Sequence, residues 1–193
     1  MVRAFLAIDL PKDLKRELSE LSKIEVSESL KLKWVEEENL HLTIHFFGNI
    51  SEKLVERILD KAKEVFKEIS PFSLELTEIN YFANKGYPRV IWIGVKDSSQ
   101  VLERINKALK ELLKKLKLEA PKEEFHPHIT LLRVKKIEEK EAFQNFWEAI
   151  KTQAKAYKDL KFSVKEIILF KSELTPKGPK YSPLGKILLG AKS

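Results

Sequence analysis

The chain has 193 residues, of which 43% are hydrophobic, 34% are charged and none is cysteine. This length and composition suit one sizeable domain or two small lobes, and the absence of cysteine excludes disulfides, thiolate nucleophiles and cysteine-ligated metal sites. No apolar run reaches the roughly 18 residues of a membrane helix, and the first residues do not resemble a signal peptide, so we expect a cytoplasmic protein without membrane contact.

The net charge is +7 and the pI is about 9.3. A surface of this sign attracts polyanions such as RNA. A lysine-rich surface also keeps a protein in solution, and the charge alone does not decide between the two interpretations. The high share of charged residues, with a single methionine, resembles the composition of thermophile proteins.

Apolar periodicity predicts strands and helices in alternation. In the first half we expect a strand over 2–8, a helix from Pro11 to about Leu21, a short strand over 32–35, a strand over 41–47, a helix from the N-cap Ser51 to about Ile69 and a strand over 72–79. In the second half we expect a strand over 89–95, a helix over 98–116, a strand around 128–131, a helix over 138–150, and strands over 162–170 and 181–190.

The second half repeats the order of the first. Arg3 matches Arg89 and His41 matches His128, at offsets of 86 and 87 residues. We therefore predict a duplicated β-α-β-α-β unit over approximately 2–80 and 88–171, followed by a C-terminal strand over 181–190. No low-complexity linker separates the copies, so residues 1–193 are expected to form a single bilobal domain.

One short pattern, His-apolar-Thr-apolar, occurs once in each copy. Its residues are His41, Leu42, Thr43 and Ile44, and His128, Ile129, Thr130 and Leu131. Because side chains alternate along a strand, His and Thr of each copy share one face while the apolar residues face the core. All four histidines of the chain lie in or beside these two stretches. An approximate two-fold would bring the two His–Thr faces together across a cleft.

Two imidazoles, each with a nearby hydroxyl, suit acid–base chemistry at a phosphate. One histidine can accept a proton from the nucleophile while the other protonates the leaving oxygen. Thr43 and Thr130 can donate to the non-bridging oxygens, and this chemistry needs no metal or other cofactor. Arg133 follows the second motif, but strand parity places it on the opposite face from His128, so a structural pair is at least as good an interpretation as phosphate contact.

A metal site is the rival chemistry. His41 and His45 have the spacing of a helical zinc pair, and His126 and His128 have that of a strand pair. A carboxylate ligand would have to come from Glu123, Glu124 or 36–38. The predicted strand over 41–47 speaks against the first pair, because residues four apart in a strand are about 13 Å apart.

Aromatic residues near the motifs can either stack a nucleobase or fill the core. Among them we single out Phe5 and Trp34 as candidate substrate contacts, with Trp34 as the base platform. Tyr181 is either a third site residue or the anchor of a turn.

The motifs, with the opening stretch 3–8 and the tail 181–184, resemble the 2H phosphoesterase superfamily, and in particular the RNA 2′,3′-cyclic phosphodiesterases once named 2′-5′ RNA ligases. The resemblance covers nearly the whole chain. It implies a bilobal α+β fold with two antiparallel sheets, outer helices and a central cleft that holds both motifs, in which one lobe contains both termini.

The resemblance also implies a reaction. Members open a terminal 2′,3′-cyclic phosphate of RNA to a 2′-phosphate without a metal, and in reverse they form a 2′-5′ bond. His41 would then be the proton donor and His128 the proton acceptor. The expected partner is an RNA with a cyclic phosphate end, such as a tRNA fragment, and the expected form is a monomer. Two alternatives stay open: a cyclic phosphodiesterase for a small nucleotide such as ADP-ribose cyclic phosphate, and an RNA-end-binding module without turnover.

Overall fold

The computed structural model describes residues 1–190. Within them the strands are β1 (Val2–Asp9), β2 (Leu30–Trp34), β3 (His41–Ile50), β4 (Phe72–Asn84), β5 (Tyr87–Lys96), β6 (His128–Ile137), β7 (Lys161–Val164), β8 (Glu166–Thr175) and β9 (Gly178–Leu188). The α-helices are α1 (Lys12–Ser19), α2 (Glu52–Phe66), α3 (Val101–Leu116) and α4 (Lys140–Ala154), with 3-10 turns at Glu20–Lys23, Glu37–Asn39 and Lys155–Tyr157.

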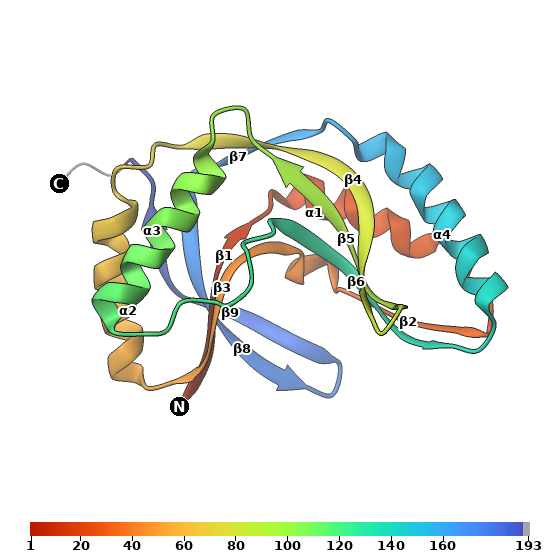
Figure 1. The fold of residues 1–193 in the computed structure, drawn as a ribbon, viewed down its shortest axis with the longest axis horizontal. Coiled ribbons are helices and arrows are strands. Elements are labelled where there is room, and N and C mark those ends of the chain that lie inside the picture. Colours follow the sequence, from red (N-terminus) through yellow and green to blue (C-terminus); the bar gives the residue numbers. More distant parts are fainter. Residues whose placement is uncertain (191–193) are drawn as a thin grey trace.

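The strands form one antiparallel sheet in the order β7-β4-β5-β6-β3-β1-β8-β9, with β2 also paired to β6. At its centre β3 and β6 are joined by a single residue pair, Leu42 with Ile129. The sheet is therefore divided into a terminal lobe (β1, β3, β8 and β9) and a distal lobe (β2, β4, β5, β6 and β7). In Figure 1, α2 and α3 lie together at one end of the molecule and α4 lies at the other, with α1 nearer the middle behind the strands. The predicted α+β bilobal fold is confirmed, with the two expected sheets joined at this one point.

Strand pairing follows the predicted duplication. Leu42 and Ile129, which are matched in the two copies, lie opposite each other, and so do Ser73 of β4 and Ser163 of β7. Matched residues face each other in this way when an approximate two-fold axis passes between them. Each lobe contains strands from both copies of the repeat, since β4 pairs with β5 and β8 pairs with β1. The terminal lobe contains β1 and β9, and thus both ends of the described chain.

The single strand predicted over 162–170 is wrong in one respect. It is two strands, β7 and β8, separated at Lys165. The break occurs because this segment crosses between lobes: β7 pairs with β4, whereas β8 pairs with β1. Hydrophobic alternation along the segment reports burial, and both parts are buried, so the change of partner leaves no mark in the sequence.

The helices cover one face of the sheet with apolar stripes. In α2 the hydroxyl of Ser51 accepts a hydrogen bond from the backbone N–H of Leu54 at 3.1 Å, which caps the N-terminus. Its buried residues Val55, Ile58 and Ala62 follow at helical spacing. No helix within residues 1–190 combines the length and the apolar character needed to cross a membrane.

A second, smaller apolar cluster lies apart from the main core. It consists of Phe5, Ala7, Ile168 and Phe170, with Tyr181 packed against it. Its members come from β1, β8 and β9 of the terminal lobe. Ala7 is paired with Thr43, so the cluster lies on the face of the sheet that carries the two motifs, which we call the motif face.

Candidate active site

The two His–Thr patterns lie on β3 and β6, where the lobes meet. Leu42 and Ile129 are fully buried, and the His and Thr on either side of them are only partly buried. The strands touch at these two apolar residues, so both His–Thr pairs flank the junction on the motif face. The charge of His128 is close enough to lower the pKa of His41.

Each motif strand contains a β-bulge directly after its Thr. In the pairing of β1 with β3, Leu6 faces His45 and Ala7 faces Thr43, which leaves Ile44 as the extra residue. In the pairing of β5 with β6, the same step leaves Leu131 as the extra residue. A bulge of one residue shifts the alternation of side chains. Beyond each bulge, residues that simple parity assigns to the core therefore point to the motif face.

Arg133 is the residue most affected by this shift. Leu131 and Leu132 are both buried, at 2% and 0% exposure, and Arg133 is exposed. The parity argument that placed Arg133 opposite His128 was therefore wrong, because the bulge returns it to the motif face. Consistent with that position, the charge of Arg133 acts on the pKa of Tyr181 in the other lobe. Its counterpart after the first bulge is Phe46, which is 61% exposed.

Backbone carbonyls hold both histidines in the same way. Nδ1 of His41 lies 2.6 Å from the carbonyl oxygen of Asn39, and Nδ1 of His128 lies 2.6 Å from that of His126. A carbonyl only accepts, so each Nδ1 carries the proton and donates. Nε2 of each ring is thereby left to exchange a proton. Asn39 and His126 precede their motif histidines by two residues each and are matched in the duplication.

The Nε2 atoms differ in their partners. In His41 Nε2 lies 2.8 Å from the hydroxyl of Thr43. For Nε2 of His128 there is no hydrogen-bond partner within residues 1–190, and Thr130 makes no corresponding contact there. The hydroxyl of Thr43 donates to the neutral ring or accepts from the charged one, so it can follow the protonation state of His41.

Burial lowers the pKa of both histidines, because an apolar surrounding disfavours the charged ring. For His41 the bond to Asn39 and the negative charge of Asp9 act in the opposite direction. For His128 the bond to the carbonyl of His126 does so, while the His126 ring lowers the pKa further.

A carboxylate stands next to only one of the two histidines. On the strand beside each motif, Asp9 is paired with His41 and Gly94 is paired with His128. Asp9 is also bound to Lys15 at 2.7 Å. A side chain at Gly94 would collide with the Thr77 hydroxyl, so a larger residue there would require Thr77 to move. Asp9 therefore raises the pKa of His41 while the charge of Lys15 lowers it, and His128 has no such carboxylate on its neighbouring strand.

The two aromatic candidates of the terminal lobe lie around His41. The Phe5 ring is 5.0 Å from the His41 ring and 4.8 Å from Tyr181, and Tyr181 is 5.4 Å from His41. Phe5 is only 1% exposed, so it supports the rings above it and offers little surface of its own. Tyr181 is partly exposed, and burial raises its pKa, which keeps its hydroxyl protonated as a hydrogen-bond donor.

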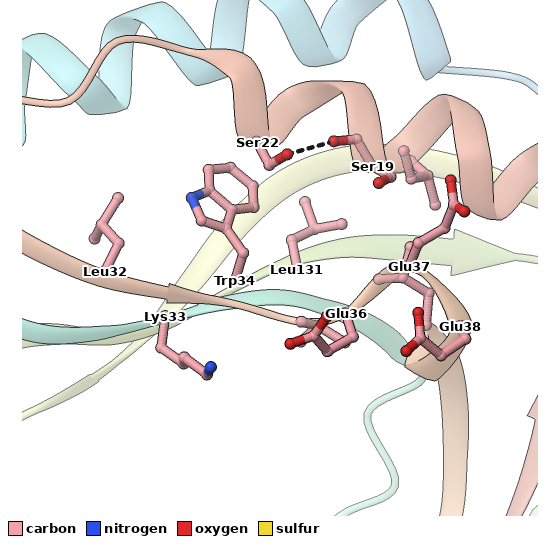
Figure 2. Close-up of a pocket in the computed structure, with 12 residues that line it drawn as sticks. Ser19, Ser22, Leu32, Lys33, Trp34, Glu36, Glu37, Glu38 and Leu131 are labelled. Atoms are coloured by element: carbon pink, nitrogen blue, oxygen red, sulfur yellow. Dashed lines mark hydrogen bonds between the residues drawn. The ribbon is translucent and has the colours of Figure 1, made fainter. Parts of the chain in front are cut away.

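Trp34 is not brought to the histidines. It is paired with the buried Leu132 and its ring meets Phe146 of α4 at 6.3 Å, which places it on the helix-covered face. There it lines a cavity of about 420 Å³ beside α1, together with the acidic residues of 36–38. Figure 2 shows Trp34 and Lys33 pointing to opposite sides of β2. Lys33, paired with Arg133, faces the motif side.

The bulge at Ile44 also separates His41 from His45, the first of the two candidate metal-binding pairs. His45 is paired with the fully buried Leu6 and its ring packs at 4.7 Å on Phe47. It therefore lies on the helix-covered face, opposite to His41. Within the described residues no three His, Asp or Glu side chains cluster in a way that would hold a metal ion.

Sequence reasoning missed two features of the site. Phe82 of β4 lies 5.0 Å from the His128 ring, and only the pairing of β4 with β5 brings it there. Asn39 is the single buried polar residue among those described, and its side-chain amide donates to the Pro179 carbonyl at 2.7 Å. The equal spacing of Asn39 and His126 from the motifs was a signal for their shared role.

Comparison with known proteins agrees with this arrangement. Residues 10–176 match the model of the 2′-5′ RNA ligase superfamily. The chain belongs to this superfamily. It is 37% identical to the RNA 2′,3′-cyclic phosphodiesterase of Methanocaldococcus jannaschii, over 93% of this chain and 96% of that one. It is 34% identical to the Archaeoglobus fulgidus protein of the same name, over 95% and 98%.

A solved relative supports the same fold. The crystal structure of TT0787 from Thermus thermophilus superposes on this member of the superfamily with a TM-score of 0.72 and 27% sequence identity. The alignment covers 99% of this chain and 100% of TT0787. The whole bilobal domain is thus shared, and not one lobe alone.

Proposed function

We propose that this protein is an RNA 2′,3′-cyclic phosphodiesterase that opens a terminal cyclic phosphate to a 2′-phosphomonoester. One observation carries the proposal: two histidines at the junction of matched strands have Nδ1 fixed by equivalent carbonyls and Nε2 left for proton transfer. The relatives named above are RNA 2′,3′-cyclic phosphodiesterases. The net charge of +7 suits an RNA end.

The two histidines divide the proton transfers. Nε2 of His128 accepts the proton of a water molecule, whose oxygen attacks the phosphorus. The P–O3′ bond breaks on the opposite side, and Nε2 of His41 gives its proton to the leaving O3′. Asp9 favours the charged form of His41, and a bound phosphate anion adds to that effect. His128 has no carboxylate beside it and remains the base.

The groups around the histidines suit the phosphate. Thr43 and Thr130 donate from their hydroxyls to the non-bridging oxygens, where negative charge grows in the transition state. The Arg133 guanidinium can bind the same oxygens through two N–H groups, and the Tyr181 hydroxyl adds a donor from the terminal lobe. Phe46, exposed and 5.5 Å from Phe5, offers a platform for the terminal nucleobase.

The test is an assay with an oligoribonucleotide that ends in a 2′,3′-cyclic phosphate. We expect a 2′-phosphomonoester product, with turnover that a chelator leaves unchanged. A tRNA fragment with the same end, acted on by a monomeric enzyme, is the RNA partner we propose. Binding of the oligonucleotide without any product would favour the RNA-end-binding module, and turnover of ADP-ribose cyclic phosphate alone would assign a small nucleotide substrate.

A further inference from the structure

Four rings gather on the motif face of the distal lobe, on the side of His128. Phe82 lies 5.0 Å from the His128 ring, 5.1 Å from Trp92 and 5.3 Å from His126. Trp92 and His126 are 4.8 Å apart. The rings come from β4, β5, β6 and the segment before β6. This cluster has no part in the proton transfers, apart from His128 itself.

The cluster has the same layering as the terminal lobe. Phe82 is 37% exposed and lies against Trp92, which is 8% exposed. In the terminal lobe Phe46 is 61% exposed and lies against Phe5, which is 1% exposed. Each lobe thus presents one outer aromatic ring supported by a buried one. In the distal lobe the outer ring, Phe82, lies next to His128, and in the terminal lobe the buried Phe5 lies between Phe46 and His41. Two such rings, one on each side of the reacting phosphate, suit two nucleosides and not one.

Trp92 of this cluster has an unpaired hydrogen-bond donor. Its indole nitrogen is the only buried side-chain nitrogen or oxygen within residues 1–190 that has no hydrogen-bond partner. Buried donors are nearly always paired, since an unpaired one loses its hydration without compensation. The unpaired N–H beside this ring cluster indicates a hydrogen-bond acceptor that the described residues do not supply.

We propose that Phe82, Trp92 and His126 bind the nucleoside that carries the 5′-hydroxyl in 2′-5′ joining. The inference rests on the proposed function, because it uses His128 as the base. In joining, the O5′–H takes the place of water: its proton passes to Nε2 of His128, the O5′–P bond forms, the P–O3′ bond breaks and His41 protonates O3′. The attacking nucleoside must therefore lie on the side of His128, where the cluster is.

A purely structural role for the cluster predicts something different. If these rings only hold His128 in place, their loss slows attack by water and attack by O5′ to the same degree. A nucleoside site affects only the second reaction. The ratio of joining to hydrolysis in one reaction mixture separates the two roles.

The experiment uses an oligonucleotide with a cyclic phosphate end together with an RNA that has a 5′-hydroxyl, and it measures both products. We expect Phe82→Leu, which keeps apolar bulk but not the aromatic face, to lower the joining-to-hydrolysis ratio roughly 5- to 100-fold, the effect of losing one base stack. Phe82→Trp is expected to retain the ratio. Phe46→Leu, the matched change in the terminal lobe, is expected to slow both reactions together.

Cleavage of a 2′-5′-linked dinucleotide to a cyclic phosphate and a 5′-hydroxyl nucleoside gives an independent readout, since it is the reverse of joining. Phe82→Leu is expected to weaken it as it weakens joining. An unchanged ratio in Phe82→Leu, or a wild-type enzyme that hydrolyses cyclic phosphate but neither joins nor cleaves 2′-5′ bonds, would overturn the nucleoside site and leave the proposed function intact. A wild-type enzyme without hydrolysis would refute the proposed function itself.

Discussion

His41 and His128 occupy matched positions, and in both a carbonyl two residues earlier holds Nδ1 at 2.6 Å. Their surroundings differ. His41 has Thr43 on Nε2 and Asp9 on the neighbouring strand, whereas His128 has a glycine on the neighbouring strand and an open Nε2. In the proposed mechanism the two copies bring two equivalent imidazoles to one phosphate, and the residues that differ between the copies assign acid and base.

The matched bulges show the same combination of equivalent backbone positions and different side chains. Both bring the third residue after the motif Thr to the motif face, but that residue is Phe46 in one lobe and Arg133 in the other. One lobe therefore presents a ring suited to a base, and the other presents a cation suited to phosphate. In the proposed site, similar backbones with different side chains would bind a substrate that has no symmetry of its own.

Removing either imidazole should have the largest effect. We expect His41→Ala and His128→Ala each to lose roughly 10²–10⁴-fold in turnover of the cyclic phosphate, because a positioned acid or base contributes about that much. RNA binding should be largely retained. His45→Ala, a histidine of the same strand on the other face, is the control and should stay near wild type. Full turnover in either motif variant would contradict the two-histidine mechanism.

The second largest loss of activity is expected for Arg133→Ala. The loss of charge-assisted hydrogen bonds of about 1.5–3 kcal/mol predicts a decrease in kcat/KM of roughly 10- to 100-fold, and Arg133→Lys should recover only part of it because a lysine cannot bind bidentately. Lys135→Ala removes a cation from the same strand as a control. Equal effects of Arg133→Ala and Lys135→Ala would mean that Arg133 contributes only general charge.

Asn39→Ala tests the buried amide that links the residue before the first motif to Pro179 of β9. The variant leaves the Pro179 carbonyl without its amide donor, and we expect the free energy of unfolding to decrease by about 1–3 kcal/mol. The His41 bond to the backbone at position 39 is preserved. Asn80→Ala, at an exposed asparagine that bonds only to the next N–H, should leave stability nearly unchanged. Chemical denaturation of both variants measures the difference.

The pH dependence should show the smallest effect. A general base is active above its pKa and a general acid below its own, and burial lowers both histidine pKa values. The bell-shaped profile of kcat/KM should therefore be centred below the ordinary histidine value of 6.5. Asp9→Asn removes a charge that raises the pKa of His41, so the alkaline limb should move further to acid pH. Asp13→Asn, which only loses a surface pair with Arg16, should leave the profile in place.

The sequence predicted the parts of this molecule that depend on local pattern. The order of elements, the inward Leu42 and Ile129 and the shared face of His and Thr follow from periodicity and repetition. Features that depend on which strands pair with each other could not be predicted from the sequence. The bulges at Ile44 and Leu131 arise from pairing with β1 and β5, and they reversed the placement of Arg133.

Trp34 and Phe82 illustrate the same limit. Trp34 stands in a polar stretch, and only the pairing of β2 with β6 shows that it points to α4 while Lys33 points to the motif face. Phe82 is far from His128 in sequence, and the sheet brings their rings together. A residue's side of a strand can be predicted from alternation only up to the first bulge.

The most direct test of the acid and base assignment uses a cyclic substrate in which sulfur replaces the leaving O3′. A thiolate leaves without being protonated, so the reaction no longer needs a general acid. The assignment predicts that the defect of His41→Ala shrinks to less than about tenfold with this substrate, while His128→Ala keeps its loss of roughly 10²–10⁴-fold. Rescue of His128→Ala in place of His41→Ala, or rescue of neither, would contradict it.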